Sequence, residues 1–346
     1  MNRLLGEILY EKEAHSQLRP ASVTKIMTIL LIMEAINSGQ ITYDTQVSCS
    51  ENAASMGGSQ IWLEVGESLT VDEMLKAICV VSANDCSVAM AEYIAGTEEA
   101  FVQKMNDKAK ELGMNDTTFK NCHGIDEDGH LTSSYDIALM SKELLNKYPE
   151  IINYTTIWMD TLRDGESELV NTNKLIRTYE GATGLKTGST SLALYNLSAS
   201  ATRDGLSLIA VVMRAPSSSE RVSNAKTLLD YGFSNYDIIN TLQQNEVVQN
   251  ISVPKGVVDN VNLVSENDCS VLIKKGNSSE IVNEIILNEE IAAPINKGDV
   301  LGKVNFYLNN ELIATTNLVA EEDVKKMNSL NMFEHLSTLW TNLLRE

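Results

Sequence analysis

The sequence lacks a long apolar run, a cysteine pair at metal-ligand spacing and an excess of basic residues. No run of 18 apolar residues occurs, so we predict no membrane-spanning helix. The five cysteines include no Cys-x-x-Cys and only four histidines are present, so we expect no metal site and no cofactor. With 47 acidic against 27 basic residues the net charge is −20, and such a surface repels phosphate backbones. Nucleic acid is therefore not an expected partner.

The cysteines do not indicate a disulfide framework either. Cys79 and Cys86 lie on one predicted helical stretch, separated by about 10 Å of rise, which is too far for a disulfide. None has the histidine context of a cysteine nucleophile. We expect all five to be small apolar core or surface residues: Cys49, Cys79, Cys86, Cys122 and Cys269.

A Ser-x-x-Lys pattern, Ser22 to Lys25, stands where a helix is predicted to begin. Pro20 ends the preceding segment, and an apolar run follows from Ile26 to Met33. Residues i and i+3 share a helix face with Cβ atoms about 5–6 Å apart, so the hydroxyl and the amine can meet. A serine nucleophile needs such a neighbouring base. Alone, the pattern is also met by an N-cap serine with a solvated lysine.

Two further motifs follow in order along the chain. Ser82-Ala83-Asn84 closes an apolar helix pattern, and Lys186-Thr187-Gly188 precedes a strand-like run. Ser-x-x-Lys, Ser-x-Asn and Lys-Thr-Gly, in that order, form the three-part active site of penicillin-interacting serine enzymes. Each motif is weak alone, but the ordered set, with each motif in its expected context, is specific.

Longer stretches of the sequence resemble the same class of penicillin-interacting serine enzymes. They are Arg19 to Thr28, Ser82 to Ala91, His123-Gly124-Ile125-Asp126 with Asp128-Gly129, and Leu228 to Phe233. From about Gly6 onward the chain resembles the low-molecular-mass penicillin-binding proteins, which are serine-type D-alanyl-D-alanine carboxypeptidases. The resemblance implies removal of the terminal D-alanine from peptidoglycan stem pentapeptides through an acyl-enzyme. It also implies β-lactams as covalent inhibitors.

The resemblance assigns catalytic roles to residues of the three motifs. Ser22 is the expected nucleophile, Lys25 its base and Ser82 a proton relay. Lys186 is the second cation which, together with burial, lowers the pKa of Lys25. The backbone N–H groups of Ser22 and Ser189 are expected to form the oxyanion hole.

The substrate-binding residues are assigned in the same way. Asn84 is expected to hold the substrate amide, and Gly188 to let the substrate backbone approach its strand. Thr187, Thr190 and Arg221 are expected to meet the terminal carboxylate. Simpler roles stay open: a helix cap for Ser82, a turn for Asn84 and a surface salt bridge for Arg221. We expect His123, in a loop between two helices, to be structural.

The fold class that we expect is an α/β penicillin-binding domain of the β-lactamase and transpeptidase type, at 1–237. Its antiparallel sheet is built from both ends of the domain, flanked by helices, with a helical insert between. We predict helices at 22–38, 70–81, 85–94, 98–112, 134–147 and 217–232, the second opened by a capping box of Thr70 and Glu73. Strands are predicted at 6–11, 186–190, 194–201 and 206–214.

A small all-β domain is predicted at 238–321, followed by an amphipathic helix at 322–346. Short alternating runs mark the β domain, at 247–253, 260–265, 270–274, 281–287, 300–308 and 312–320. The helix carries its apolar residues on one face, Trp340 among them. It either packs on the β domain or, as the resemblance favours, lies at a membrane surface.

The first residues depart from the family's pattern. Residues 6–11 resemble the second strand of the family's N-terminal hairpin, so we expect the first strand to be largely missing. No signal peptide is visible, although the resemblance implies an enzyme on the cell-wall side of the bacterial membrane, peripherally attached or secreted.

Two other functions compete with the carboxypeptidase. A class A β-lactamase needs a glutamate that activates water for deacylation. The closest text, Glu166-Ser167-Glu168-Leu169, continues with Val170 where asparagine is required, and it lies too near Lys186. A catalytically inactive cell-wall-binding module is the third possibility, and the missing first strand is its best support.

Overall fold

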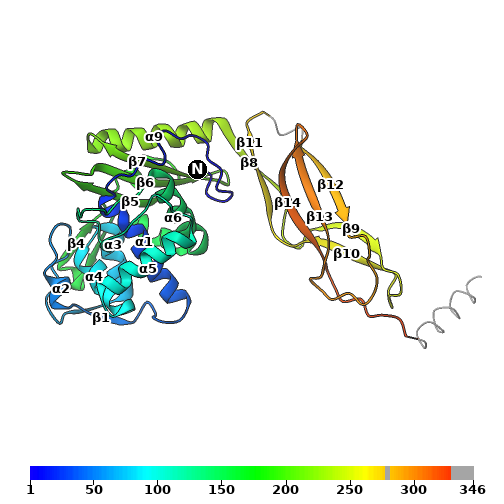
Figure 1. The fold of residues 1–346 in the computed structure, drawn as a ribbon, viewed down its shortest axis with the longest axis horizontal. Coiled ribbons are helices and arrows are strands. Elements are labelled where there is room, and N and C mark those ends of the chain that lie inside the picture. Colours follow the sequence, from blue (N-terminus) through cyan, green and yellow to red (C-terminus); the bar gives the residue numbers. More distant parts are fainter. Residues whose placement is uncertain (277–280, 329–346) are drawn as a thin grey trace, which may run out of the picture. The chain divides into compact units, whose positions relative to one another are not determined.

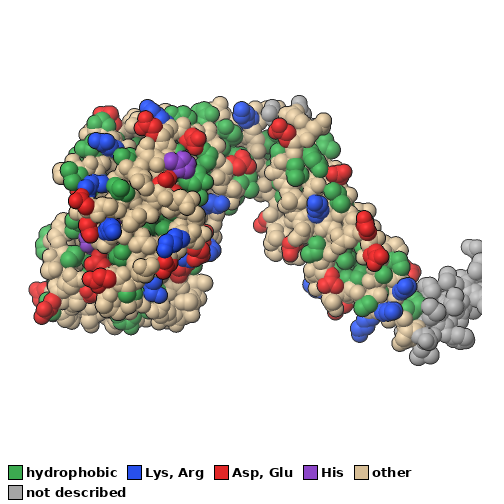
Figure 2. Space-filling view, viewed as in Figure 1, with side chains coloured by type: hydrophobic (Ala, Val, Ile, Leu, Met, Phe, Trp, Pro, Cys, Tyr) green, Lys and Arg blue, Asp and Glu red, His purple; other side chains and the backbone are tan. Residues whose placement is uncertain are grey.

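The computed structural model describes residues 1–276 and 281–328. The chain divides into two compact units, the first spanning Met1–Ser234 and the second beginning at Asn235 (Figure 1). On the face drawn in Figure 2, Lys and Arg side chains are interspersed with Asp and Glu. No helix of the described residues is long and apolar enough to cross a membrane.

The first unit is built around a buried helix that carries one of the motif residues. The 3-10 turn η1 (Ala21–Thr24) leads directly into α1 (Lys25–Asn37), in which ten of the 13 residues are buried. A helix that is apolar on nearly all sides belongs at the centre of a core. The first residue of α1, Lys25, is therefore held at a buried position.

Four other helices of this unit pack against α1: α3 (Val71–Val80), α4 (Asn84–Ala95), α5 (Glu98–Glu111) and α6 (Ser134–Lys147). The predicted capping box of Thr70 and Glu73 is present at the start of α3, with both of its hydrogen bonds formed. The long predicted helices are confirmed within a few residues. All helices and 3-10 turns of this unit after α1, predicted or not, are α2 (Glu51–Ala54), α3 (Val71–Val80), α4 (Asn84–Ala95), α5 (Glu98–Glu111), α6 (Ser134–Lys147), η2 (Pro149–Ile151), α7 (Ile152–Thr155), η3 (Arg163–Gly165), α8 (Leu175–Thr178) and α9 (Ser218–Asn235).

A three-stranded antiparallel sheet lies between α9 on one face and α1 with α6 on the other (Figure 1). Its strands are β5 (Ala182–Thr190), β6 (Leu194–Arg203) and β7 (Leu206–Ala215), in that order. The Lys-Thr-Gly motif lies on the edge strand β5, which packs against η1. Two short antiparallel pairs, β1 (Gln46–Ser48) with β2 (Ser68–Thr70) and β3 (Met159–Leu162) with β4 (Ser167–Val170), lie outside this sheet.

The strand predicted at 6–11 is wrong, because the N-terminal residues that pair with the sheet lie earlier in the chain. Only the first three residues reach the sheet, where Asn2 bridges Leu208 and Met1 exchanges hydrogen bonds with Ile209. Residues 8–12 instead line a cavity of about 610 Å³ between β7 and α9. Alternation in a short run is a weak signal because it records which faces are apolar and not whether a partner strand is available.

The described residues of the second unit after α9 form strands and connecting turns, as predicted. Its five-stranded sheet has the order β12 (Ile281–Leu287), β13 (Val300–Leu308), β14 (Glu311–Ala320), β10 (Asn260–Ser265) and β9 (Val247–Ser252). A separate pair joins β11 (Cys269–Lys274) to β8 (Tyr236–Leu242), a strand that the sequence analysis missed.

The predicted terminal helix does not begin at 322. Val324 bridges Ile295 and Lys326 bridges Gly256, so this segment is extended and pairs with the β unit. The remainder of that predicted helix, 329–346, lies outside the described residues. All five cysteines are buried and free. Cys79 and Cys86 lie on two different helices, α3 and α4, so the expectation that one helical stretch carries both is wrong.

Candidate active site

The turn that carries Ser22 is held from several sides. Ala21 has φ +51°, a conformation that a non-glycine residue rarely adopts. Asn196, fully buried on β6, donates from Nδ2 to the carbonyl oxygens of Arg19 (2.9 Å) and Pro20 (3.0 Å). The turn is therefore tied to the sheet directly beside the nucleophile candidate.

Two glycines allow the neighbouring chain segments to approach this turn. A Cβ on Gly124, at φ +94°, would lie 2.0 Å from the Ala21 carbonyl oxygen. A Cβ on Gly188 would lie 2.8 Å from the Pro20 oxygen and from the amides of Ser22 and Val23. In this structure glycine at 188 is thus required by the packing of β5 against η1.

Lys25 is joined directly to the serine three residues before it. Its Nζ donates to Ser22 Oγ at 3.3 Å, to Asn84 Oδ1 at 2.5 Å and to the His123 carbonyl oxygen at 2.6 Å. The lysine is fully buried. Burial, and secondly the nearby Lys186 ammonium, hold the pKa of Lys25 well below its usual range. The lowered pKa favours the neutral amine that a base requires, in which the contact with Ser22 reverses so that the hydroxyl donates to Nζ.

The Ser-x-Asn motif lies at the junction of α3 and α4. Ser82 has φ +68°, and its buried Oγ has no hydrogen-bond partner among the described residues. Asn84 begins α4, accepts from Lys25 and donates from Nδ2 to the Gly57 carbonyl oxygen at 2.7 Å. The structure thus brings Ser22, Lys25 and Asn84 into one hydrogen-bonded group and leaves the Ser82 hydroxyl unpartnered.

Lys186 is a second buried lysine, on β5. Its Nζ donates to the Thr187 carbonyl oxygen at 3.0 Å. Burial lowers the pKa of Lys186 to about 7. The Thr187 hydroxyl lies 2.7 Å from the hydroxyl of Thr172, a residue that the sequence analysis did not single out. Threonine at 172 has no sequence signal, since only the tertiary fold places it against β5.

Arg221 reaches the motif strand from α9. Its Nη1 donates to the carbonyl oxygens of Gly188 (3.4 Å) and Asn196 (3.2 Å), and it forms no ion pair with a described residue. A surface salt bridge therefore does not explain this arginine. The Ser189 side chain is exposed, and Thr190 Oγ1 accepts from the Ala193 amide in the turn after β5.

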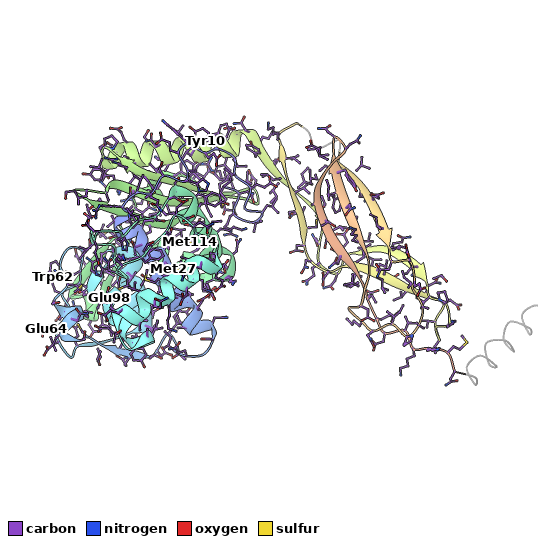
Figure 3. All side chains as sticks on the ribbon, viewed as in Figure 1. Tyr10, Met27, Trp62, Glu64, Glu98 and Met114 are labelled. Carbon is purple, nitrogen blue, oxygen red and sulfur yellow. The ribbon has the colours of Figure 1, made fainter. Side chains whose placement is uncertain are left out.

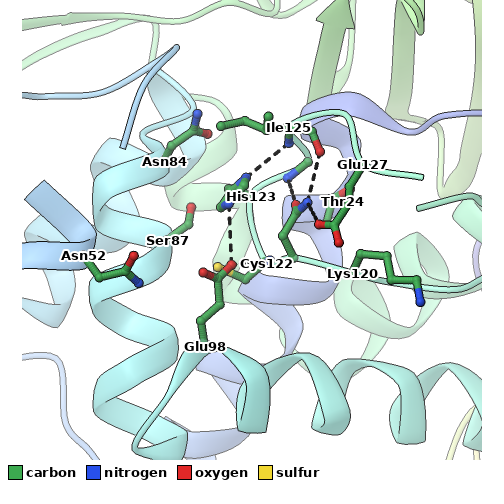
Figure 4. Close-up of polar contacts among 12 residues, drawn as sticks. Thr24, Asn52, Asn84, Ser87, Glu98, Lys120, Cys122, His123, Ile125 and Glu127 are labelled. Carbon is green, nitrogen blue, oxygen red and sulfur yellow. Dashed lines mark hydrogen bonds and ion pairs between the residues drawn. The ribbon is translucent and has the colours of Figure 1, made fainter. Parts of the chain in front are cut away.

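The loop before Gly124 supplies a contact that sequence reasoning missed, from the His123 carbonyl oxygen to Lys25. The imidazole ring of His123 lies between the Ile125 amide and Glu98 (Figure 4). Because Nδ1 accepts from Ile125 N–H, the ring proton is on Nε2, 3.5 Å from Glu98 Oε1. Burial lowers the pKa of His123 to about 3, so the ring is neutral. The histidine is structural, but its backbone belongs to the site.

Comparison with known proteins follows the same division of the chain. The family model described as D-alanyl-D-alanine carboxypeptidase matches residues 1–217. The chain belongs to the D-alanyl-D-alanine carboxypeptidase family. A second family model, described as the C-terminal domain of penicillin-binding protein 5, matches residues 236–326.

The relatives cover nearly the whole chain. D-alanyl-D-alanine carboxypeptidase DacF of Bacillus subtilis is 45% identical, over 99% of this chain and 88% of its own. DacC of Escherichia coli is 32% identical, over 94% and 83%. The crystal structure of penicillin-binding protein 5 from Haemophilus influenzae has a TM-score of 0.81 at 32% identity, covering 94% of this chain and 96% of that one. The expected penicillin-binding fold followed by a β domain is thereby confirmed.

Proposed function

We propose that this protein is a serine-type carboxypeptidase that removes the terminal D-alanine from peptidoglycan stem pentapeptides. The observation that carries the proposal is the contact of Lys25 Nζ with Ser22 Oγ, made by a fully buried amine beside a second lysine. A serine so paired is activated without a histidine. The relatives' names support the same activity.

The proposed reaction is acyl transfer in two steps. Ser22 Oγ attacks the carbonyl carbon between the two D-alanines as Lys25 accepts the hydroxyl proton. The C–N bond breaks, the proton passes to the departing D-alanine nitrogen with Ser82 as relay, and an ester on Ser22 remains. Water then hydrolyses the ester. The N–H groups of Ser22 and Ser189 stabilise the oxyanion, each such donor being worth about 3–4 kcal/mol.

The proposed substrate lies between β5 and Asn84. Asn84 holds the amide on the amino side of the scissile bond. Lys186, Thr187, Thr190 and Arg221 supply cations and hydroxyls for the terminal carboxylate. Arg221 already lies against the Gly188 carbonyl oxygen, which places its guanidinium on the β5 side of the site.

Intact-mass spectrometry with benzylpenicillin, combined with D-alanine release from a peptide ending in D-Ala-D-Ala, tests the proposal. We expect a lasting one-to-one adduct and D-alanine release, both lost in Ser22→Ala and kept in Ser38→Ala, an exposed serine after α1. Rapid drug hydrolysis without an adduct would instead identify a β-lactamase. An intact drug without an adduct would identify a binding module.

Relatives of known structure bear on the choice of probe. Penicillin-binding protein D2 of Listeria monocytogenes was solved in an ampicillin-bound form, with a TM-score of 0.61 at 29% identity, covering 67% of this chain and 94% of that one. In this chain Glu166 and Glu168, the β-lactamase candidates, are exposed residues around the start of β4. This exposure supports a lasting adduct over drug hydrolysis.

The proposed place of action is the cell-wall side of the bacterial membrane. The apolar pattern of the last residues, read from sequence alone, supports peripheral attachment through that segment. Co-sedimentation with anionic vesicles, compared between the full chain and a chain ending at residue 328, tests the attachment. Equal recovery of the two chains in the pellet would contradict it.

A further inference from the structure

Trp62 is an exposed tryptophan held in a fixed backbone conformation beside the candidate site. Its exposed fraction is 73%, and its φ is +55°, which is rare for a bulky residue. Figure 3 labels it on the outer surface of the first unit, where Glu64, two residues further along the chain, is labelled as well. Such outliers persist only where the surrounding structure holds them in place, and they cluster at functional sites.

A buried carboxylate, that of Asp85, accepts hydrogen bonds from the backbone of the loop that carries Trp62. Asp85 Oδ2 accepts from the amides on both sides of Trp62, those of Ile61 (3.0 Å) and Leu63 (3.1 Å). Asp85 is fully buried, and the side chains of Ile61 and Leu63 are buried as well. The indole is thus the outward-facing side chain between two inward-facing ones.

A guanidinium, that of Arg163, donates hydrogen bonds to carbonyl oxygens of the same loop. Arg163 donates from Nη1 to the Ile61 carbonyl oxygen at 2.8 Å and from Nη2 to the Trp62 carbonyl oxygen at 3.4 Å. It also pairs with both oxygens of Glu67, at 2.7 and 3.0 Å. With Asp85 and Arg163 together, the position of Trp62 is set before any ligand arrives.

The loop is also attached to the candidate substrate-binding asparagine. The backbone N–H of Asn84 donates to the Ser59 carbonyl oxygen, and the Asn84 side chain donates from Nδ2 to the Gly57 carbonyl oxygen, both at 2.7 Å. Asp85, the next residue of α4, holds Ile61 and Leu63. The loop that presents Trp62 is therefore hydrogen-bonded to the end of α4 that carries Asn84.

We propose that Trp62 is a specificity-determining residue that packs against the side chain preceding D-Ala-D-Ala in the substrate. This inference rests on the proposed function. The occupant that fits is a long aliphatic side chain ending in an amine. The exposed indole face offers apolar area, and Glu64, exposed two residues further along the same loop, offers a negative charge.

Two acetylated peptides that differ in one side chain test this inference. They are Nα-acetyl-L-Lys-D-Ala-D-Ala and Nα-acetyl-L-Ala-D-Ala-D-Ala, assayed by D-alanine release. We expect Trp62→Ala to lower kcat/KM for the lysyl peptide about 3- to 10-fold, the range of one aromatic contact, and less than about 2-fold for the alanyl peptide. Alanine keeps the Cβ, so the backbone strain is unchanged. Tyr93→Ala, an exposed aromatic near the far end of α4, is the matched control and should change neither rate.

The remaining outcomes each overturn the inference. Equal losses with the two peptides would mean that Trp62 only maintains the loop under Asn84. Unchanged rates with both peptides would mean that the indole does not contact substrate. If the wild-type protein forms a penicillin adduct, and the Trp62→Ala variant shows no loss of kcat/KM specific to the lysyl peptide, this inference alone fails. If the wild-type protein cleaves neither peptide and forms no adduct, the proposed function fails with it.

Discussion

Substitution of Gly124 by alanine tests whether a glycine outside the three motifs shapes the nucleophile turn. The added Cβ would lie 2.0 Å from the Ala21 carbonyl oxygen and 2.9 Å from the Ser22 amide nitrogen, whereas real Cβ contacts essentially never fall below 3.0 Å. Both neighbours are backbone atoms and cannot rotate away. One of the two segments must therefore move by about 1 Å, and a displacement of that size can reduce a rate about 100-fold.

The matched control is Gly96→Ala at the end of α4. Gly96 has φ +86°, close to the +94° of Gly124, but nothing lies within 4 Å of its added Cβ. Both variants carry the penalty of an alanine at positive φ, about 1–2 kcal/mol, and only one carries the clash. Thermal unfolding followed by circular dichroism measures that shared penalty.

The assay is the rate of benzylpenicillin adduct formation followed by intact mass. We expect Gly124→Ala to react about 100-fold more slowly than the wild type, and Gly96→Ala to react within about twofold of it. A Gly124→Ala protein that folds and is acylated at the wild-type rate would refute the reasoning. It would show that the turn before Ser22 adapts without moving the nucleophile.

Two further predictions concern buried polar groups around the site. Because burial lowers the pKa of Lys186 from 10.5 to about 7, the unfolded chain binds this proton more tightly, and stability is lost as pH falls between those values. Lys186→Met should therefore raise Tm at pH 6 by at least about 3 °C, or roughly 1 kcal/mol, with little change at pH 11. Because the variant lacks the second cation, the pKa of Lys25 should rise, and the acid limb of the pH–rate profile of acylation should move to higher pH. An unchanged or lower Tm at pH 6 contradicts this prediction. Asn196→Ala leaves the Pro20 carbonyl oxygen and the Arg214 amide without their side-chain partner, so denaturant unfolding should show a loss of about 1–3 kcal/mol, and acylation should slow. Acylation at the wild-type rate in this variant would show that the tie to β6 does not position Ser22.

The sequence was sufficient where the decisive geometry is local. Ser22 and Lys25 are three residues apart at the start of a helical stretch, so their contact follows from helical spacing alone. The capping box of Thr70 and Glu73 is equally local, and it formed as predicted. The order of the three motifs pointed to the family, which the comparisons confirm over nearly the whole chain.

The local sequence pattern was insufficient where pairing between strands determines the secondary structure. Residues 6–11 alternate like a strand, yet only Met1 to Arg3 reach the edge of β7. Val324 and Lys326 belong to a segment with helical periodicity, yet they pair with Ile295 and Gly256. Strand pairing depends on a partner that is distant in the chain, and periodicity in one segment carries no information about that partner.

The sequence by itself determined the family, the penicillin-binding fold followed by a β domain, and the pairing of Ser22 with Lys25. Only the tertiary structure decided which neighbours complete the site: the His123 carbonyl oxygen, the Asn196 side chain, the Thr172 hydroxyl and the loop that presents Trp62. The physical reason is that these contacts are made by backbone atoms and ordinary polar side chains. Their role comes from where the chain brings them and not from their residue type.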